Sequence, residues 1–97
     1  MIAALVVVEL HVPAVGSLKA KRGVVKSLMA ALRRELEVSV AEVGHQDLWQ
    51  RATLGVAAAA GSEVGARKVA QNVEKVVYRE PRVELIGIDV EIVATER

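Results

Sequence analysis

Basic side chains gather where a helix is expected to begin. Residues 17–22 (SLKAKR) place three cations within about the first one and a half turns of that helix. Free backbone N–H groups at a helix N-terminus attract anions, and nearby Lys and Arg side chains add to this attraction. We therefore interpret Ser17, Lys19, Lys21 and Arg22 as a candidate anion or phosphate site. The alternative is a solvated helix face whose lysine stems cover apolar surface.

Trp49 and Arg51 form a second candidate. Alternation of apolar and polar residues in this region predicts a strand, and residues two positions apart on a strand point to the same side. On the uncovered side of a sheet, this pair would stack on a nucleic-acid base or fill a partner's pocket. The alternative is a contact at the rim of the sheet. His45 and Asp47 precede the pair, but two residues do not close a metal site, and a polar turn is their simpler role.

Catalytic chemistry has little support in the sequence. Four titratable side chains stand on two strands that are expected to be neighbours: Glu9, His11, Asp89 and Glu91. Such a cluster has the groups for acid–base chemistry, although charges on a sheet more often prevent aggregation. The chain has no Cys, which excludes disulfides, thiolate metal sites and a cysteine nucleophile. We predict no catalytic residue, no metal and no cofactor.

The composition favours one domain, residues 1–97, with an aliphatic core. A chain of 97 residues leaves no room for a second independent core. Hydrophobic residues make up 53% of the chain, yet Phe is absent, so Val, Leu, Ile and Ala must fill the interior. The net charge of +1 gives no global field, and electrostatic recognition must therefore be local. Residues 1–34 contain one acid and six basic side chains, which predicts a basic end of the molecule.

Hydrophobic periodicity predicts six elements that position these residues. The first is a continuous apolar strand, which is far shorter than the roughly 20 residues that span a bilayer. A second helix begins at Ser62 and ends before Pro81. The order βαββαβ predicts a ferredoxin-like α+β sandwich, with a four-stranded antiparallel sheet and both helices on one face. The predicted strands cover residues 2–10, 37–44, 48–60 and 82–94, and the first helix covers residues 18–35.

This arrangement leaves the other face of the sheet open. We expect a homodimer to cover it, because both faces of the first strand are apolar. The side chains expected on this open side are Ala3, Leu5, Val7, Val38, Val40, Thr53, Gly55 and Ala57. In the last strand, alternation places Ile86, Ile88, Val90 and Ile92 on one face.

Three blocks of the chain resemble the YlxP-like family of small bacterial proteins, whose function is unknown. They are residues 11–13 (HVP) with 17–22 (SLKAKR), residues 39–44 (SVAEVG) and residues 47–52 (DLWQRA). The resemblance covers nearly the whole chain and implies a ferredoxin-like fold and a cytoplasmic location. Genes of the family often neighbour genes for transcription and translation factors, which implies work on RNA or the ribosome. Family members often have an aromatic residue and Asn where this chain has residues 36–38 (LEV).

We therefore expect a cytoplasmic, non-enzymatic binding module that associates with RNA or the ribosome and not with a membrane. Its expected cationic contacts are Lys19, Lys21, Arg22 and Arg51. The alternative is a homodimeric small-ligand or protein-interaction domain without nucleic-acid binding. Salt-dependent binding of RNA separates these two hypotheses.

Overall fold

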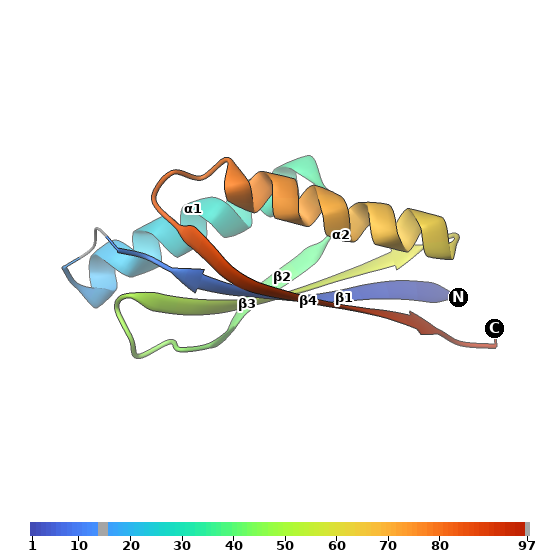
Figure 1. The fold of residues 1–97 in the computed structure, drawn as a ribbon, viewed down its shortest axis with the longest axis horizontal. Coiled ribbons are helices and arrows are strands. Elements are labelled where there is room, and N and C mark those ends of the chain that lie inside the picture. The colour runs from blue at the N-terminus through green and yellow to red at the C-terminus, as the bar shows by residue number, and fades with distance from the viewer. Residues whose placement is uncertain (14–15, 97) are drawn as a thin grey trace.

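Six elements follow one another in the order predicted from the sequence. The computed structural model describes residues 1–13 and 16–96. The sheet order is β2-β3-β1-β4, and every pairing is antiparallel. This topology is the predicted ferredoxin-like α+β fold (Figure 1). The elements are β1 (Ile2–His11), α1 (Leu18–Glu35), β2 (Ser39–Gly44), β3 (Arg51–Ala60), α2 (Glu63–Tyr78) and β4 (Glu84–Ala94).

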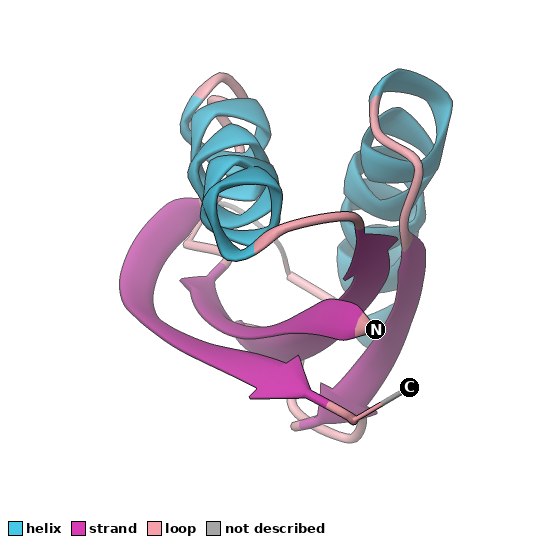
Figure 2. Ribbon diagram, turned by 90° about the vertical axis from the view of Figure 1, so that its right-hand side faces the viewer, coloured by secondary structure: helices cyan, strands magenta, loops and turns pink. Residues whose placement is uncertain are grey.

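Both helices lie over one face of the sheet and leave the other face uncovered (Figure 2). β1 lies inside the sheet and pairs along its whole length with β3 on one side and β4 on the other. Its even-numbered side chains, from Ala4 to Leu10, face the helices and are buried. Its odd-numbered side chains therefore point to the uncovered face. Among the described residues, no helix is long and apolar enough to cross a membrane.

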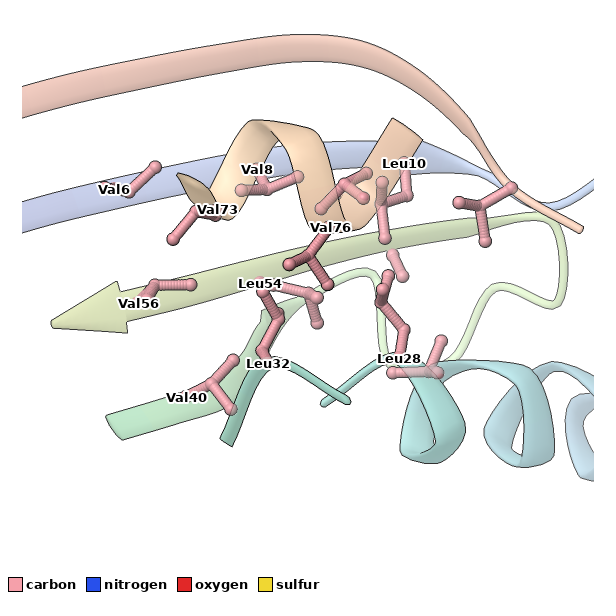
Figure 3. Close-up of a cluster of buried hydrophobic side chains, with 14 of the residues drawn as sticks. Val6, Val8, Leu10, Leu28, Leu32, Val40, Leu54, Val56, Val73 and Val76 are labelled. Atoms are coloured by element: carbon pink, nitrogen blue, oxygen red, sulfur yellow. The ribbon is translucent and has the colours of Figure 1, made fainter. Parts of the chain in front are cut away.

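The core is a layer of Val and Leu side chains between the helices and the sheet (Figure 3). Each helix contributes a buried stripe at helical spacing. Because Phe is absent and the Trp is exposed, small aliphatic side chains fill the interior, as the composition requires. The stripe of α1 contains Val24, Val25, Leu28 and Leu32, and that of α2 contains Ala66, Ala70, Val73, Val76 and Val77.

Serine caps both helices at their N-termini. Ser17 Oγ accepts a hydrogen bond from Ala20 N at 3.1 Å, and Ser62 Oγ accepts one from Gly65 N at 3.0 Å. The first turn of α2 also holds the acid Glu63, whereas the first turn of α1 holds no acid. The positive end of the α2 dipole is therefore matched by a negative charge, and that of α1 is not.

Polar contacts of Arg79 and Arg82 join the C-terminal end of α2 and the residues after it to α1. Arg79 at the end of α2 donates a hydrogen bond to Glu35 at the end of α1. This hydrogen bond is the main reason why the pKa of Glu35 is lowered. Arg82 donates to Glu80 at 2.7 Å and to Ser27 Oγ of α1 at 3.1 Å. The pKa of Glu80 is likewise lowered, chiefly by its side-chain hydrogen bond with Arg82.

The predicted facing of β2 is wrong. Val40 lies in the core and Val38 packs against it, so neither belongs to the open face. Residues 38–41 are small or apolar on both sides, and the facing of the strand is fixed by its pairing with β3, in which Val40 lies opposite Val56. Ser39 and Ala41 take the open side instead, because they pair with residues of β3 that face it.

The register of β4 also departs from simple alternation. A β-bulge lies opposite the Glu9–Leu10 step, so Leu85 pairs with Leu10 while Gly87 pairs with Glu9. Ile86 is the extra residue of this bulge and is exposed, whereas Leu85 packs against the core. The predicted single face for the isoleucines therefore fails at its first member. β3 begins at Arg51, three residues later than predicted.

We expect Leu54→Ala to lower the free energy of unfolding by about 2–5 kcal/mol, because Leu54 is fully buried between the sheet and the helices. Urea unfolding followed by circular dichroism measures this change. Leu48→Ala is the matched control, since Leu48 is about half exposed in the β2–β3 loop. The control should shift stability by less than about 0.5 kcal/mol. Equal losses in both variants would contradict this placement of the core.

Candidate functional site

The fold brings the candidate residues together at one end of the molecule. The start of α1, the end of β1 and the loop between β2 and β3 lie at this end, and both chain termini lie at the other (Figure 1). We call residues 16–26 and 44–51 the α1-hairpin end. All six candidates of the sequence analysis belong to it, although they come from two segments of the chain: Ser17, Lys19, Lys21, Arg22, Trp49 and Arg51.

Lys21 is the side chain that joins the two segments. It is 0% exposed, and its Nζ lies 2.7 Å from Oε2 of Glu42 on β2. Nζ also donates hydrogen bonds to the carbonyl oxygen of His45 at 2.8 Å and to that of Gln46 at 3.4 Å. A buried ammonium needs this degree of pairing, because an unpaired charge inside a protein is strongly unfavourable. Lys21 thus holds the hairpin loop and is not at the surface, where an anion would meet it.

The backbone of the hairpin loop forms a turn that directs two carbonyl oxygens towards the Lys21 ammonium. His45 has a φ of 58°, a left-handed conformation that few residues other than glycine adopt. Its carbonyl oxygen accepts from Leu48 N at 3.1 Å as well as from Lys21, and Gln46 Nε2 donates to Glu42 O at 2.9 Å. The polar turn predicted for residues 44–47 is therefore observed. The two hydrogen bonds that its carbonyl oxygen accepts, from Leu48 N and Lys21 Nζ, hold His45 in this conformation.

The cations that remain at the surface form a row along α1. Lys19 and Arg22 are exposed, and Lys26 continues the row one turn later. None of the three forms an ion pair with another described residue. Arg22 and Lys26 line a groove of about 360 Å³ between α1 and the hairpin, with Gln46 and Asp47 on its opposite wall. We call Lys19, Arg22 and Lys26 the basic row.

Trp49 lies beside the start of α1. A Cβ built on Gly16 would be 3.9 Å from Cζ3 of the Trp49 ring, so the ring lies beside the residue that precedes the helix cap. The side chain remains 46% exposed. It belongs to the loop and not to β3, so the prediction that Trp49 and Arg51 share one strand is wrong. The ring nevertheless offers an exposed aromatic surface next to the first turn of α1.

Arg51 faces the uncovered side of the sheet, where it belongs to a polar cluster around Glu9. Oε2 of Glu9 accepts a hydrogen bond from Thr53 Oγ1 at 2.8 Å. The same oxygen lies 3.6 Å from Arg51 NH2 and 3.8 Å from His45 Nε2. His11 Nδ1, at the end of β1, lies 3.5 Å from Oε2 of Glu84. The carboxylate of Glu9 is therefore shared among groups of its own chain.

The acid–base cluster considered in the sequence does not come together. Asp89 pairs with Val7 and Glu91 with Leu5 in the register of β1 and β4, so both acids stand further along the sheet than Glu9 and His11. Within residues 1–13 and 16–96, no group of three or more His, Cys, Asp and Glu side chains could hold a metal ion. Among the described residues at this end, Lys21 and Glu42, and also Arg51 and Glu9, form ion pairs within the protein, and Lys19, Arg22 and Lys26 are exposed charges.

Sequence reasoning missed two features of this end. Glu42 was not assigned as the partner of Lys21, and Lys26 was not included among the surface cations. Both had a signal in the sequence. Position 21 lies on the same helical stripe as the buried Val25 and Leu28, which predicts an inward lysine that needs an acid. Lys26 lies seven positions after Lys19, on the same face of the helix.

The fold and this end of the molecule define the class of protein: a small ferredoxin-like α+β protein with a charged end and an uncovered sheet face. Residues 3–90 match the family described as "Protein of unknown function (DUF503)", and the chain belongs to this family. The uncharacterized protein YlxP of Bacillus subtilis (strain 168) is 39% identical over 69 residues, which cover 71% of this chain and 75% of that protein. The resemblance to YlxP-like proteins is thereby confirmed.

A solved structure shares the fold alone. It is a mutant of SnoaB, a cofactor-independent oxygenase from Streptomyces nogalater. The likeness covers 98% of this chain and 94% of that chain, with a TM-score of 0.52 and 9% sequence identity.

We expect Lys21→Met to lower the free energy of unfolding by about 2–4 kcal/mol, because it leaves the Glu42 carboxylate without its cation and removes a hydrogen-bond donor from each of two loop carbonyls. Chemical denaturation measures the loss. Lys19→Met removes the same charge from an exposed position of the same helix, and it should change stability by less than about 0.5 kcal/mol.

The double variant Lys21→Met/Glu42→Gln separates the ion pair from packing. Because it removes both charges together, it should be more stable than Lys21→Met alone. If the double variant were destabilised by the sum of the two single losses, the coupling of Lys21 to Glu42 would be refuted.

Proposed function

We propose that this protein is a non-enzymatic cytoplasmic module that binds single-stranded RNA through the α1-hairpin end. The observation that carries the proposal is the basic row, in which Lys19, Arg22 and Lys26 stand exposed on one face of α1 without an ion-pair partner among the described residues. Cations arranged in this way are available to phosphate groups. They lie along the helix whose first turn holds no acid, so the positive end of its dipole adds to their field.

Trp49 supports a nucleic acid over a simple anion. Its half-exposed ring stands next to Gly16, immediately before the helix cap, and therefore close to the start of the basic row. Bases of a single strand stack on exposed aromatic rings while basic side chains follow the phosphates. An inorganic anion would use the cations and not the ring. One aromatic residue allows a single stacked base, so the proposed interaction is weak and depends mainly on charge.

Two of the cations predicted as contacts are assigned other roles. Lys21 is neutralised by Glu42 inside the protein, and Arg51 faces Glu9 on the uncovered side of the sheet. In the proposal, Lys21 positions the loop that carries Trp49, and Arg51 does not contact RNA. The contacts are then Lys19, Arg22, Lys26 and Trp49, with the Ser17 hydroxyl at the helix cap as a further donor.

We expect Lys19→Ala/Arg22→Ala to weaken binding of a labelled single-stranded RNA and to reduce its salt dependence. Each lost phosphate contact lowers the slope of log K against log salt by about 0.7, so the double variant should lose about 1.4. Fluorescence anisotropy across a salt series measures both quantities. Trp49→Ala should instead weaken binding by about 1–3 kcal/mol at every salt concentration with an unchanged slope.

Lys68→Ala/Lys75→Ala is the matched control. Both lysines are exposed on α2 and form no ion pair with another described residue, so this variant changes the net charge by the same amount. It should keep the wild-type slope. If both double variants lost the same amount of RNA affinity, net charge alone would explain the loss, and a site on α1 would be contradicted. Absence of binding by the wild type at low salt would favour the alternative, a protein-interaction or small-ligand domain without nucleic-acid binding.

A further inference from the structure

We propose that the uncovered face of the sheet is the interface of a homodimer. The open face consists of the side chains that point away from both helices. Their assignment follows from the strand register, since paired residues share a face. Its members are Ala3, Leu5, Val7, Glu9 and His11 of β1; Ser39, Ala41 and Val43 of β2; Arg51, Thr53, Gly55, Ala57 and Ala59 of β3; and Glu84, Gly87, Asp89, Glu91 and Val93 of β4.

The centre of this face is apolar where a solvated sheet would be polar. Leu5 and Val7 of the inner strand β1 are 41% and 38% exposed, and Val43 beside them is exposed as well. A sheet with one wet face alternates apolar and polar residues along its strands, whereas β1 is apolar on both sides from Ala3 to Val8. Leu5, Val7 and Val43 line a shallow hollow of about 430 Å³. This composition is typical of a strand that is covered on both faces.

The size of the face matches what a stable dimer needs. Its four strands contain 10, 6, 10 and 11 residues. At about 3.3 Å per residue and about 4.8 Å between strands, the face measures roughly 600 Å². Two copies that overlap completely would bury roughly 1,200 Å² in total, above the threshold of about 1,000 Å² for a specific interface. Face-to-face packing of two twisted sheets is a common arrangement.

The polar groups of the face are compatible with being covered. Thr53 points to the open side, yet it is buried, and its hydroxyl is already bonded to Glu9. Glu9 also has Arg51 and His45 within 4 Å, so this carboxylate does not depend on water alone. A partner can therefore cover Glu9 without leaving its carboxylate unpaired.

Charged side chains flank the apolar centre of the open face. Asp89 and Glu91 stand on β4 at one side of the apolar centre, and neither forms an ion pair with another described residue. Arg51, with two histidines nearby, stands on β3 at the end of the face. Most charges of this face are carboxylates, and its one arginine already lies 3.6 Å from Glu9. The apolar centre and the area of the face, and not charge, therefore favour a second copy as the occupant.

Sedimentation velocity from low to high micromolar concentration tests the dimer. The wild type should sediment as a dimer. Leu5→Asp should raise the dissociation constant by roughly a hundredfold or more, because it places an unpaired carboxylate at the apolar centre. Val64→Asp is the matched control, since Val64 is 78% exposed on α2, away from the sheet, and this variant should remain dimeric.

A second variant keeps the test valid if Leu5→Asp fails to fold. Leu5→Thr/Val7→Thr retains residues that favour strands and removes only the apolar contact, so it should give a folded monomer by circular dichroism. A wild-type monomer at high micromolar concentration would overturn the proposal, and the face would then be left for another occupant. A dimer that persists in both face variants, or that is lost in Val64→Asp, would also overturn it. None of these outcomes depends on whether RNA binds.

Discussion

The inner strand β1 must satisfy two environments at once, and the rest of the fold follows from this requirement. Its even-numbered side chains form the floor of the core, against which both helices pack. Its backbone pairs on both edges, with β3 and with β4. Because its odd-numbered side chains are apolar as well up to Val7, the strand fixes the position of the helices and also determines the character of the opposite face. Both the core and the open face therefore depend on residues 2–10.

The charged end of the molecule depends in turn on one buried ammonium. Lys21 enters the protein from α1 and meets Glu42 and two carbonyl oxygens of the hairpin. Without this contact, the loop that carries Trp49 would have no polar tie to the helix among the described residues. The same helix presents Lys19 and Arg22 to solvent. Three cations that look alike in the sequence thus divide into one structural residue and two that are available to a ligand.

The element order was predictable because most segments have a distinct hydrophobic pattern and are separated by turn or capping residues. The continuous apolar run of residues 2–10 and the Ser-capped helical stripes are local signals. The facing of Val40 was not predictable from alternation, since residues 38–41 are small or apolar on both sides of the strand. The burial of Lys21 depends on a contact between residues far apart in the chain, and its spacing to Val25 and Leu28 was the only local indication. The bulge in β4 is fixed by pairing with β1, and Gly87 beside it was the local indication in the sequence.

The tie at Lys21 also bears on how the protein moves. The first turn of a helix and the tip of a hairpin usually fray independently, because each has few contacts. Here one ammonium belongs to both, and neither segment can open without exposing it or leaving the Glu42 carboxylate alone. We therefore expect the helix start and the loop to open as one cooperative unit on the timescale of hydrogen exchange. The aromatic ring in the loop and the basic side chains at the helix start would then be ordered together or lost together.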